Sequence, residues 1–499
     1  MSLAAAIEAW RALLGEAHVS SGGPPLDAVR RSTFPVSQSA SAVLRPGSAD
    51  EVRGCLRIAS REGVRLHPVS GGRNWGLGSR VPPVDGTAVM DLARLDRIVA
   101  FDESMAWVTV EPGVTFAQLY AFLAARGSRL FVNSTGASPG SSVLANALLR
   151  GDGAGPLGDR WTHVCGLEVA LGTGEVLRTG YARHPGSPLA PLHRHGVGPV
   201  LDGLFSQSSL GVVTRMTVWL TPLPASIQAV RFSCADDARL PGAIDALRAL
   251  VLEGTVRWPA GIWNAVRVLS TLGPRGDLGA LRAAHGLGHR WYGLTALAGA
   301  TELQGRAHRE RLVDVLGPAV DAWSIEERVG DAVSGAELLL PEEPAFRFLQ
   351  GMPHEESVRS VYWCAGASPP SDLDPDRDGC GVLWLCPTVP LIGAAVRDAM
   401  LRLEAVMESY GFDPMLAGVA HGARAMHLAP LLLWDRAVPG RDAAAMACHA
   451  ALVTAMEELG CLPYRVGIPP LDRVPTGDDD RDAVLARLRA ALDPGRALG

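Results

Sequence analysis

Four glycines fall within the thirteen residues of PVSGGRNWGLGSR (68–80), between a short apolar run and a Pro-Pro turn. Glycine permits positive φ angles and lets a ligand approach the backbone, so successive N–H groups here can form a concave nest for a pyrophosphate. Arg73 adds a positive charge to that nest. The stretch is not a Walker A loop, which needs Gly-Lys-Ser/Thr, and GLGSRV lacks the third glycine of a dinucleotide fingerprint. Taken alone, a glycine-rich loop after a strand is more often a plain turn.

Two later segments have the same character. The stretch GASPGSSVLANALLRGDGAGPLGDRW (136–161) contains a glycine-rich turn that leads into a helix, whose first amides near Ser141 and Ser142 suit an anion. A second run of glycines follows at once, and HGVGPVLDGLFSQSSLGVVTRMTVWL (195–220) supplies a third segment. Together they favour a ligand cradle over a plain turn.

The composition limits the classes of function. All 46 basic residues are arginine, and they are interspersed with acidic residues to a net charge of only -6, so no nucleic-acid partner is expected. The absence of lysine excludes P-loop NTPases and Schiff-base enzymes. A chain of 499 residues is too long for one core and indicates two or three lobes.

The cysteines and the N-terminus bear on the cellular compartment. The eight cysteines form no Cys-x-x-Cys and no His/Cys group at zinc spacing, so we expect a reducing compartment, the cytoplasm, and no metal site. The first residues, MSLAAAIEAWRALLGEAHV, are interrupted by Glu8, Arg11 and Glu16 at helical spacing. They predict an amphipathic surface helix rather than a signal peptide or membrane span.

Helical and strand-like patterns alternate along residues 42–222. They predict a helix near 50–64, strands ending at His67 and near Ala88–Leu92, a helix in TFAQLYAFLAARG, and two strands joined by a Gly-Thr-Gly turn in GLEVALGTGEVLRTG. A last strand in GVVTRMTVWLTPLP is closed by prolines, which mark a boundary near 225. Beyond it, helices and strand-like runs alternate as in a separate lobe, so the fold class is α+β.

In order and spacing, these segments, with LPYRV and ALDPGRALG near the C-terminus, resemble the vanillyl alcohol oxidase and para-cresol methylhydroxylase (VAO/PCMH) flavoprotein family. The resemblance covers about 40–225 and resumes near 380–499. It implies a two-subdomain FAD-binding domain formed by 1–225 and 460–499, with an inserted α+β cap domain, 226–459, that carries much of the substrate pocket. The FAD contacts that it implies are Ser70, Gly71, Gly72, Arg73, Asn74, Trp75, Gly76, Pro139, Gly140, Ser141, Ser142, Asn146, Gly151, Gly155, Gly158, Gly211, Val212 and Val213.

The resemblance also bears on how the flavin is attached. Many relatives tether it through a His or Tyr in the cap, where this chain has Gly381 or Val382, and others use a His in the first loop, where it has Arg73. Neither alternative leaves a residue that can bond to flavin, so we expect dissociable FAD. Cys380 and Cys386 lie near the cap anchor, and buried bystander thiols are the preferred interpretation.

In phenol-oxidising relatives, two tyrosines and an arginine bind the phenolate while flavin takes a hydride from the benzylic carbon, leaving a quinone methide. Tyr464 and Arg465 match one tyrosine and the arginine, and such a pair suits a phenolate or a carboxylate. The other tyrosine falls on Leu77, which makes the pocket more apolar there. Asp159 matches an aspartate near the flavin that acts as a base, with a turn cap as the alternative.

Other positions complete the candidate site. Arg160 replaces a histidine of the relatives and is expected to pair with Asp159 or turn toward solvent. Arg424 and His427 resemble cap residues that approach the active site, and His421 has no such counterpart. A buried core residue is an equally good interpretation of His427. The expected substrate-pocket residues are Leu77, Arg160, Val382 and Trp384.

The resulting hypothesis is an FAD-dependent oxidation of a small para-hydroxyphenyl compound, extending to oxidative decarboxylation of a tyrosine-derived natural product. Leu77, Arg160 and Arg465 favour a carboxylate-bearing substrate. Oxidation of a non-phenolic alcohol, sugar or lactone on the same fold stays open, as does a non-catalytic flavin-binding protein. Because relatives commonly dimerise through the cap, a homodimer is among the implied states.

Overall fold

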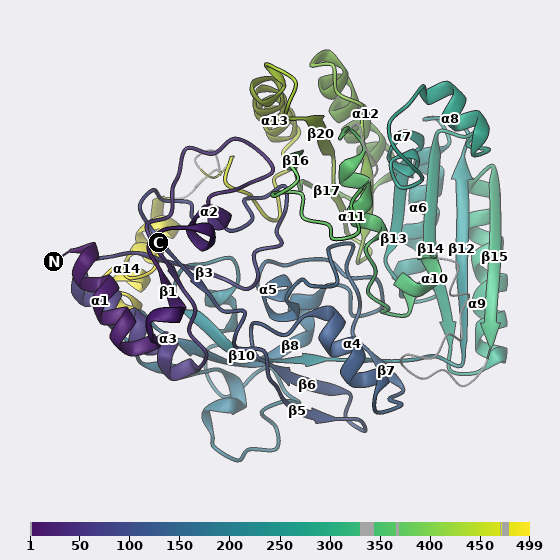
Figure 1. Ribbon diagram of the computed structural model, residues 1–499. Helices are drawn as coiled ribbons and strands as arrows, with labels where there is room; N and C mark the ends of the chain where they lie inside the picture. Colours follow the sequence, from purple (N-terminus) through teal and green to yellow (C-terminus); the bar gives the residue numbers. More distant parts are fainter. Residues whose placement is uncertain (1, 330–343, 366–368, 470, 472–478) are drawn as a thin grey trace.

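The computed structural model describes residues 2–329, 344–365, 369–469, 471 and 479–499. Three sheets form its framework. Figure 1 shows helix α1 and the C-terminus at one end of the molecule and the largest sheet at the other. The α+β fold class expected from the sequence is confirmed.

The first sheet has four strands in the order β1-β2-β4-β3, with β2, β4 and β3 parallel. Its strands are β1 Val19–Ser20, β2 Val43–Leu44, β3 Leu66–Val69 and β4 Ala88–Asp91, and its helices are α1 Leu3–Leu14, α2 Pro24–Val29 and α3 Ala49–Glu62. Helix α3 begins because Ser48 accepts the N–H of Glu51, and it ends at Gly63, whose φ is 68°. The predicted helix near 50–64 and both predicted strands are confirmed.

The second sheet has five antiparallel strands in the order β5-β6-β10-β8-β9. Its strands are β5 Ile98–Asp102, β6 Trp107–Val110, β8 Val164–Ala170, β9 Val176–Arg178 and β10 Val212–Trp219; nearby lie α4 Phe116–Ala124, α5 Val143–Leu148, β7 Leu130–Phe131 and β11 Thr221–Pro222. The sheet shares one apolar core with α4 and α5. The predicted Gly-Thr-Gly hairpin is β8–β9, and Gly174 in its turn has a φ of 82°.

The third sheet has seven strands in the order β15-β12-β14-β13-β18-β19-β17. Its strands are β12 Ser226–Cys234, β13 Ala260–Asn264, β14 Trp291–Gly299, β15 Ala322–Val329, β17 Thr388–Pro390, β18 Ala417–Ala420 and β19 Ala425–Leu428. The longer helices of this part are α6 Leu240–Leu252, α9 Glu302–Leu316, α12 Gly393–Ser409 and α13 Arg441–Glu458, and the shorter ones are α7 Ala265–Leu269, α8 Leu278–Ala284, α10 Pro344–Leu349 and α11 Glu356–Arg359. Strands β16 Cys380–Trp384 and β20 Leu431–Asp435 pair separately.

The end of the chain returns to the first sheet. After α14 Asp479–Leu492, Leu498 forms a parallel bridge with Leu66 at β3, and Ala497 is fully buried. Residues 464–468 connect two regions, because Tyr464 donates its N–H to Cys386 and Ile468 donates its N–H to Leu77. The expected domain limits at 225 and 459 stay a prediction.

Candidate active site

The first glycine-rich loop follows β3 with a backbone that requires glycine. Gly71, Gly72 and Gly76 have φ values of 79°, 65° and 79°. A Cβ at Gly72 would lie 2.0 Å from Arg80 Cγ, and the Arg80 guanidinium donates to the Gly71 carbonyl at 2.8 Å. Positive φ angles of this kind belong to tight turns, and a turn with exposed N–H groups is the setting in which an anion nest forms.

The second glycine-rich segment faces the first loop. Arg73 Nη1 donates to Ser138 Oγ at 2.9 Å, and a Cβ at Gly140 would lie 2.9 Å from Arg73 Cζ. Ser142 caps α5 by accepting the N–H of Ala145. The Ser141 hydroxyl is buried without a hydrogen-bond partner. The two loops therefore make facing walls, and one wall carries a buried hydroxyl that a bound anion can satisfy.

Several other predicted flavin-binding glycines have packing reasons of their own. A Cβ at Gly151 would lie 2.3 Å from Asn146, one at Gly155 would lie 2.4 Å from Asn133, and one at Gly211 would lie 2.5 Å from Val169. Close packing, together with a φ of 142° at Gly155, accounts for glycine at these positions. Their roles toward FAD, and those of Asn74, Trp75, Pro139, Gly158, Val212 and Val213, stay predictions.

Strand β16, which lies in the expected cap, packs against the first loop. A Cβ at Gly76 would lie 2.3 Å from the Trp384 ring and 3.1 Å from Val382 Cγ1. Thr33 Oγ1 accepts the Gly76 N–H at 3.0 Å and donates to the Val382 carbonyl at 2.9 Å. Leu77, only 6% exposed, accepts the N–H of Ile468. Three of the predicted substrate-pocket residues thus lie around one loop.

Four polar side chains from distant parts of the sequence converge to form what we term the Asp152 cluster. Asp152 Oδ1 lies 3.1 Å from His421 Nε2 and 3.3 Å from His427 Nδ1. The Tyr464 hydroxyl donates to Asp152 Oδ2 at 3.3 Å. The rings of His427 and Tyr464 stack with centroids 3.8 Å apart and an interplanar angle of 11°.

The electrostatics of the cluster follow from burial and opposed charges. Burial raises the pKa of Asp152, but the charges and hydrogen bonds of His421 and His427 outweigh it and hold that pKa well below its ordinary value. Burial raises the pKa of the Tyr464 hydroxyl, with the Asp152 charge acting in the same direction. Asp152 is therefore an ionised acceptor and Tyr464 a neutral donor.

Arg465 adds a cation beside Tyr464. Its Cζ lies 5.6 Å from the Tyr464 ring centroid, and its Nε is buried without a hydrogen-bond partner. Burial opposes its charge, yet Tyr464, Cys386 and Asp152 raise its pKa above the ordinary value. A buried, charged guanidinium with a free donor is suited to bind an anionic oxygen.

The expectation for Arg160 is wrong. Instead of pairing with Asp159 or turning to solvent, its side chain is only 2% exposed and donates from Nε to Asn146 Oδ1 at 2.7 Å. Its Cζ lies 4.9 Å from the Phe116 ring centroid, and burial lowers its pKa to about 10 despite the nearby Asp152 charge. Burial disfavours the guanidinium charge, and the hydrogen bond to Asn146 and the contact with the Phe116 ring partly offset that cost.

Two of the predicted catalytic residues lie apart from the contacts described for the cluster. Asp159 is exposed and makes no side-chain capping hydrogen bond to the short helix that follows it, although its backbone bridges to that of Asp152. Arg424 is exposed, and its carbonyl accepts the N–H of Leu391. Their catalytic roles stay predictions.

Asp152 and His421 were not among the predicted site residues. The His421 side chain is only 8% exposed beside Asp152, although the sequence offered no counterpart for it. The available signals were an acidic residue between two glycines, GDG (151–153), and a second histidine six residues before His427. Neither signal indicates contact between segments some 270 positions apart.

The donor atoms of Asp152, His421 and His427 lie within 4.8 Å of one another, a set that can hold a metal ion. Arg160 and Arg465 are cations close enough to interact with the same carboxylate. Their repulsion lowers the affinity for a metal ion and favours an organic anion as the partner of this cluster.

The two cysteines near the expected cap anchor, Cys380 and Cys386, are poor nucleophiles. All eight cysteines are free. Burial raises the pKa of Cys380 to about 12 and that of Cys386 above its ordinary value, even though Arg465 and Tyr464 act in the opposite direction on Cys386. Both thiols are therefore protonated near neutral pH.

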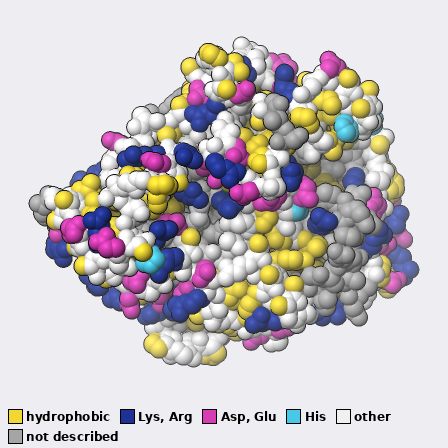
Figure 2. Space-filling model, in the orientation of Figure 1, with side chains coloured by type: hydrophobic (Ala, Val, Ile, Leu, Met, Phe, Trp, Pro, Cys, Tyr) yellow, Lys and Arg dark blue, Asp and Glu magenta, His cyan; other side chains and the backbone are white. Residues whose placement is uncertain are grey.

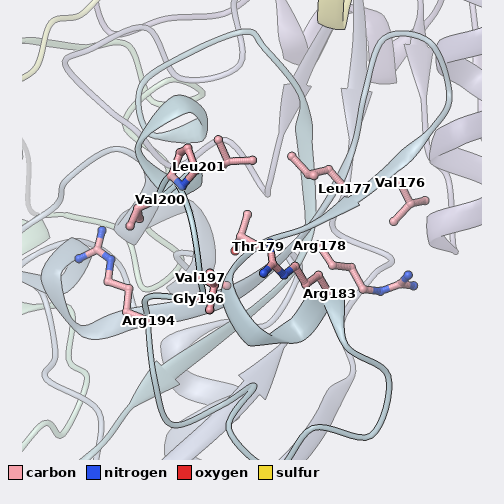
Figure 3. Close-up of a pocket in the computed structure, with 12 residues that line it drawn as sticks. Val176, Leu177, Arg178, Thr179, Arg183, Arg194, Gly196, Val197, Val200 and Leu201 are labelled. Carbon is pink, nitrogen blue, oxygen red and sulfur yellow. The ribbon is translucent and has the colours of Figure 1, made fainter.

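A separate surface hollow of about 330 Å³ lies along residues 176–201 (Figure 3). Arg178 there pairs with Glu168 at 2.8 Å, and Arg194 lies 3.6 Å from the buried Asp202. None of its lining residues belongs to the Asp152 cluster or to the two facing glycine-rich loops. Because these two arginines are already paired, the hollow is a weaker candidate for a binding site than the cluster.

The surface agrees with the charge pattern of the sequence. Figure 2 shows basic and acidic side chains interspersed over the visible face, without one large basic area. Within the described residues, no helix is both long and apolar enough to cross a membrane.

Comparisons with known proteins address the whole chain. Residues 40–180 match the FAD binding domain family. The chain is 39% identical to 1'-carboxy-chondrochloren decarboxylase of Chondromyces crocatus, over 99% of this chain and 96% of the relative. It is 28% identical to the 4-cresol dehydrogenase [hydroxylating] flavoprotein subunit of Pseudomonas putida, over 99% of this chain and 94% of that relative. The structure of p-cresol methylhydroxylase with substrate bound matches with a TM-score of 0.89 and 26% identity, over 99% of this chain and 95% of that one.

Proposed function

Since the chain belongs to the VAO/PCMH family of FAD-dependent oxidoreductases, we propose that it oxidises a para-hydroxyphenyl compound at the benzylic carbon and releases a neighbouring carboxylate as carbon dioxide. The observation that carries the proposal is the near full-length similarity to a decarboxylase. The buried Arg465 with its free donor, beside Tyr464, supports an anionic substrate.

FAD, when bound, supplies the acceptor for a hydride. We propose that the backbone nest of 70–76 and the facing segment at 139–142 hold its pyrophosphate, with Arg73 contributing charge. The positive φ angles of Gly71 and Gly72 and the unpartnered buried hydroxyl of Ser141 support this fit. Val382, fully buried at the expected anchor, and the protonated thiols nearby support dissociable FAD.

The residues around the substrate have different proposed tasks. Arg465 binds the phenolate or the carboxylate as a charge-assisted donor, and Tyr464 orients the phenol oxygen. Leu77 supplies an apolar wall in place of a second hydroxyl, so this clamp holds a phenolate with fewer donors. The cap residues Val382 and Trp384 close the site against the first loop.

The proposed reaction balances without an added base or metal at the carbon. The phenol loses a proton and the benzylic carbon loses a hydride, which leaves a neutral quinone methide. The carboxylate on the adjacent carbon then breaks its C–C bond, and that electron pair forms the side-chain double bond and restores the aromatic phenolate. The products are a para-vinylphenol and carbon dioxide.

Oxidation of a non-phenolic alcohol on the same fold is the second candidate. Leu77 in place of the second tyrosine favours it, because one fewer donor faces a phenolate. A homodimer and a cytoplasmic location complete the proposal; size-exclusion chromatography with light scattering tests the former and fractionation of the source cells the latter.

Anaerobic mixing of the FAD-loaded protein with three panels tests the function: 4-alkylphenols, 3-(4-hydroxyphenyl)propionate-type acids, and sugars or simple alcohols. We expect the acids to bleach the flavin absorption and to give a product lighter by the mass of carbon dioxide and two hydrogens. Bleaching by phenols alone indicates ordinary benzylic oxidation. Bleaching by the alcohol panel alone would replace the proposal with the second candidate.

A further inference from the structure

A carboxyl from the loop before β16 contacts the first glycine-rich loop. Asp376 Oδ1 accepts the hydroxyl of Ser79 at 2.9 Å, across a separation of 297 residues. Ser79 is only 8% exposed, and Asp376 is partly buried. The contact therefore joins the expected cap to the loop that follows β3, and neither residue belongs to the Asp152 cluster.

Ser79 has a backbone conformation that few residues other than glycine adopt. Its φ of 56° lies in the left-handed region, where the backbone crowds a Cβ atom. Its N–H donates to the Asn74 carbonyl at 3.2 Å, which closes the turn 74–79. The hydroxyl bond to Asp376 adds a side-chain contact that stabilises this strained turn.

The residue after Ser79 carries this restraint to the glycine nest. Arg80 donates from Nε and Nη2 to the Gly71 carbonyl, at 3.1 and 2.8 Å. A Cβ at Gly72 would lie 2.0 Å from Arg80 Cγ, so the arginine side chain packs directly on the nest. Because Ser79 and Arg80 are consecutive, Asp376 can act on the shape of the nest through them.

The surroundings of Asp376 disfavour its charged form. Burial is the largest effect and raises the pKa of this carboxyl to about 7, with the charge of Asp374 acting in the same direction. The hydrogen bonds from Ser79 and Trp75 and the charge of Arg80 act in the opposite direction and offset only part of this shift. Near neutral pH, Asp376 is therefore divided between its neutral and ionised forms.

Strand β16 brings one further titratable group to this carboxyl. The Cys380 thiol interacts with Asp376, and burial raises the pKa of that thiol to about 12. The thiol stays protonated near pH 7 and contributes no charge. The main charged neighbours of Asp376 in the described part of the chain are thus Asp374 and Arg80.

FAD bound at the nest brings further negative charge toward Asp376. Repulsion between the pyrophosphate and a carboxylate favours the neutral form of the carboxyl. We propose that Asp376 holds the first loop in its FAD-binding conformation as a neutral acid, so that FAD binds together with one proton at this carboxyl. Asp376 is a positioning residue, because it acts on the nest through Ser79 and Arg80. The inference rests on the proposed place of the FAD pyrophosphate and not on the proposed substrate.

The linked step is a protonation alone. The Asp376 carboxylate takes one proton from solvent as FAD binds, an O–H bond forms, and no electrons are exchanged with the cofactor. Because bound FAD raises the pKa of Asp376 above about 7, FAD affinity is constant near pH 6 and falls as the pH rises through 7. A further rise of about one unit in that pKa makes the Kd at pH 8.5 about sevenfold larger than at pH 6.

Dilution of the FAD-loaded protein in buffers from pH 6 to 8.5 tests the linkage. The Kd is read from the fluorescence of the FAD released at equilibrium, and FAD itself keeps its charge over this range. Asp376→Asn mimics the neutral acid and keeps an acceptor oxygen for Ser79, whereas Asp376→Ala removes that acceptor. The matched control is Asp372→Asn in the same loop, because the Asp372 side chain is 85% exposed and pairs with Arg377.

The two Asp376 variants separate the charge of this residue from its position. Asp376→Asn should keep its pH 6 affinity at every pH, because an amide does not ionise in this range, and Asp372→Asn should follow the unsubstituted protein. Asp376→Ala should bind FAD about tenfold more weakly than Asp376→Asn at pH 6, because Ser79 loses its partner. The same pH dependence in Asp376→Asn as in the unsubstituted protein, or none in the latter, overturns the proton linkage. Equal affinities of the Asn and Ala variants at pH 6 overturn the positioning role.

A second variant decides if Asp376→Asn does not fold. Asp374→Asn removes the charge that raises the pKa of Asp376, so the fall in FAD affinity should begin at a lower pH, and an unchanged profile overturns the inference. FAD affinity is measured without substrate, so this result is independent of whether phenolic acids are oxidised. Flavin that stays with the protein after acid precipitation contradicts dissociable FAD and overturns the linkage with it.

Discussion

Replacing Tyr464 with phenylalanine removes one hydroxyl and keeps the aromatic ring. The ring stack on His427, at 3.8 Å, is retained, so the substitution acts mainly on the hydrogen bond to Asp152 and on the proposed contact with substrate. A hydrogen bond to a charged group contributes about 1.5–3 kcal/mol. At about 1.4 kcal/mol per tenfold change, the rate of flavin reduction by a phenolic acid should fall roughly 10- to 150-fold.

Anaerobic stopped-flow absorption of the FAD-loaded protein measures this rate. Tyr292→Phe is the matched control, because its hydroxyl also takes part in a hydrogen bond, accepting the N–H of His289 at 2.9 Å, in a different part of the chain. Tyr464 and Asp152 share one hydrogen bond, so Tyr464→Phe combined with Asp152→Asn should cost little more than the more severe single change. An unchanged rate in Tyr464→Phe, or fully multiplicative losses in the double variant, would refute this reasoning.

The remaining predictions concern selectivity, the cofactor and stability. Leu77→Tyr should increase the rate of flavin reduction by 4-ethylphenol relative to the rate with a phenolic acid, and an unchanged ratio of the two rates would argue against Leu77 as a pocket residue. The larger side chain overpacks this buried position and should lower the free energy of unfolding by about 1–3 kcal/mol. Gly72→Ala places a Cβ against Arg80 at a φ of 65° and should weaken FAD binding at least tenfold in a fluorescence titration, with equal affinity counting against the nest. Acid precipitation should release all of the flavin into the supernatant, whereas a yellow pellet with the mass of a flavinylated peptide contradicts dissociable FAD. The pKa of Asp152 is lowered in the folded protein, so the ionised carboxylate contributes its full stabilisation above the ordinary pKa of about 4, and that stabilisation is lost as the pH falls below this value. Between pH 6 and 3, the free energy of unfolding of the unsubstituted protein should therefore drop more than that of Asp152→Asn. Equal drops in denaturant titrations would mean that the carboxylate is not stabilised by its partners.

Local patterns predict much of the framework of this protein. The helix near 50–64 and the Gly-Thr-Gly hairpin are set by short-range signals, namely a capping serine, a terminal glycine and alternating apolar residues. The position of the first loop beside β3 follows in the same way. These features depend on residues that are close in the sequence.

The Asp152 cluster depends on contacts that no local pattern encodes. Asp152 meets His427 and Tyr464 across separations of 275 and 312 residues. Arg160 was misplaced for a related reason, since its burial depends on Asn146 and Phe116 rather than on the adjacent Asp159. The sequence predicts that Arg160 pairs with its neighbour Asp159 or turns toward solvent, whereas tertiary packing places it against Asn146 and Phe116.

The most direct test of the proposed function follows the carboxylate itself. The FAD-loaded protein is mixed anaerobically with a para-hydroxyphenyl propionate-type acid carrying carbon-13 in the carboxylate, and labelled carbon dioxide is measured against the flavin reduced. We predict one labelled carbon dioxide for each flavin reduced, together with the para-vinylphenol. Flavin reduction with the label retained in the product would contradict decarboxylation, and no reduction by any such acid would contradict the proposed substrate class.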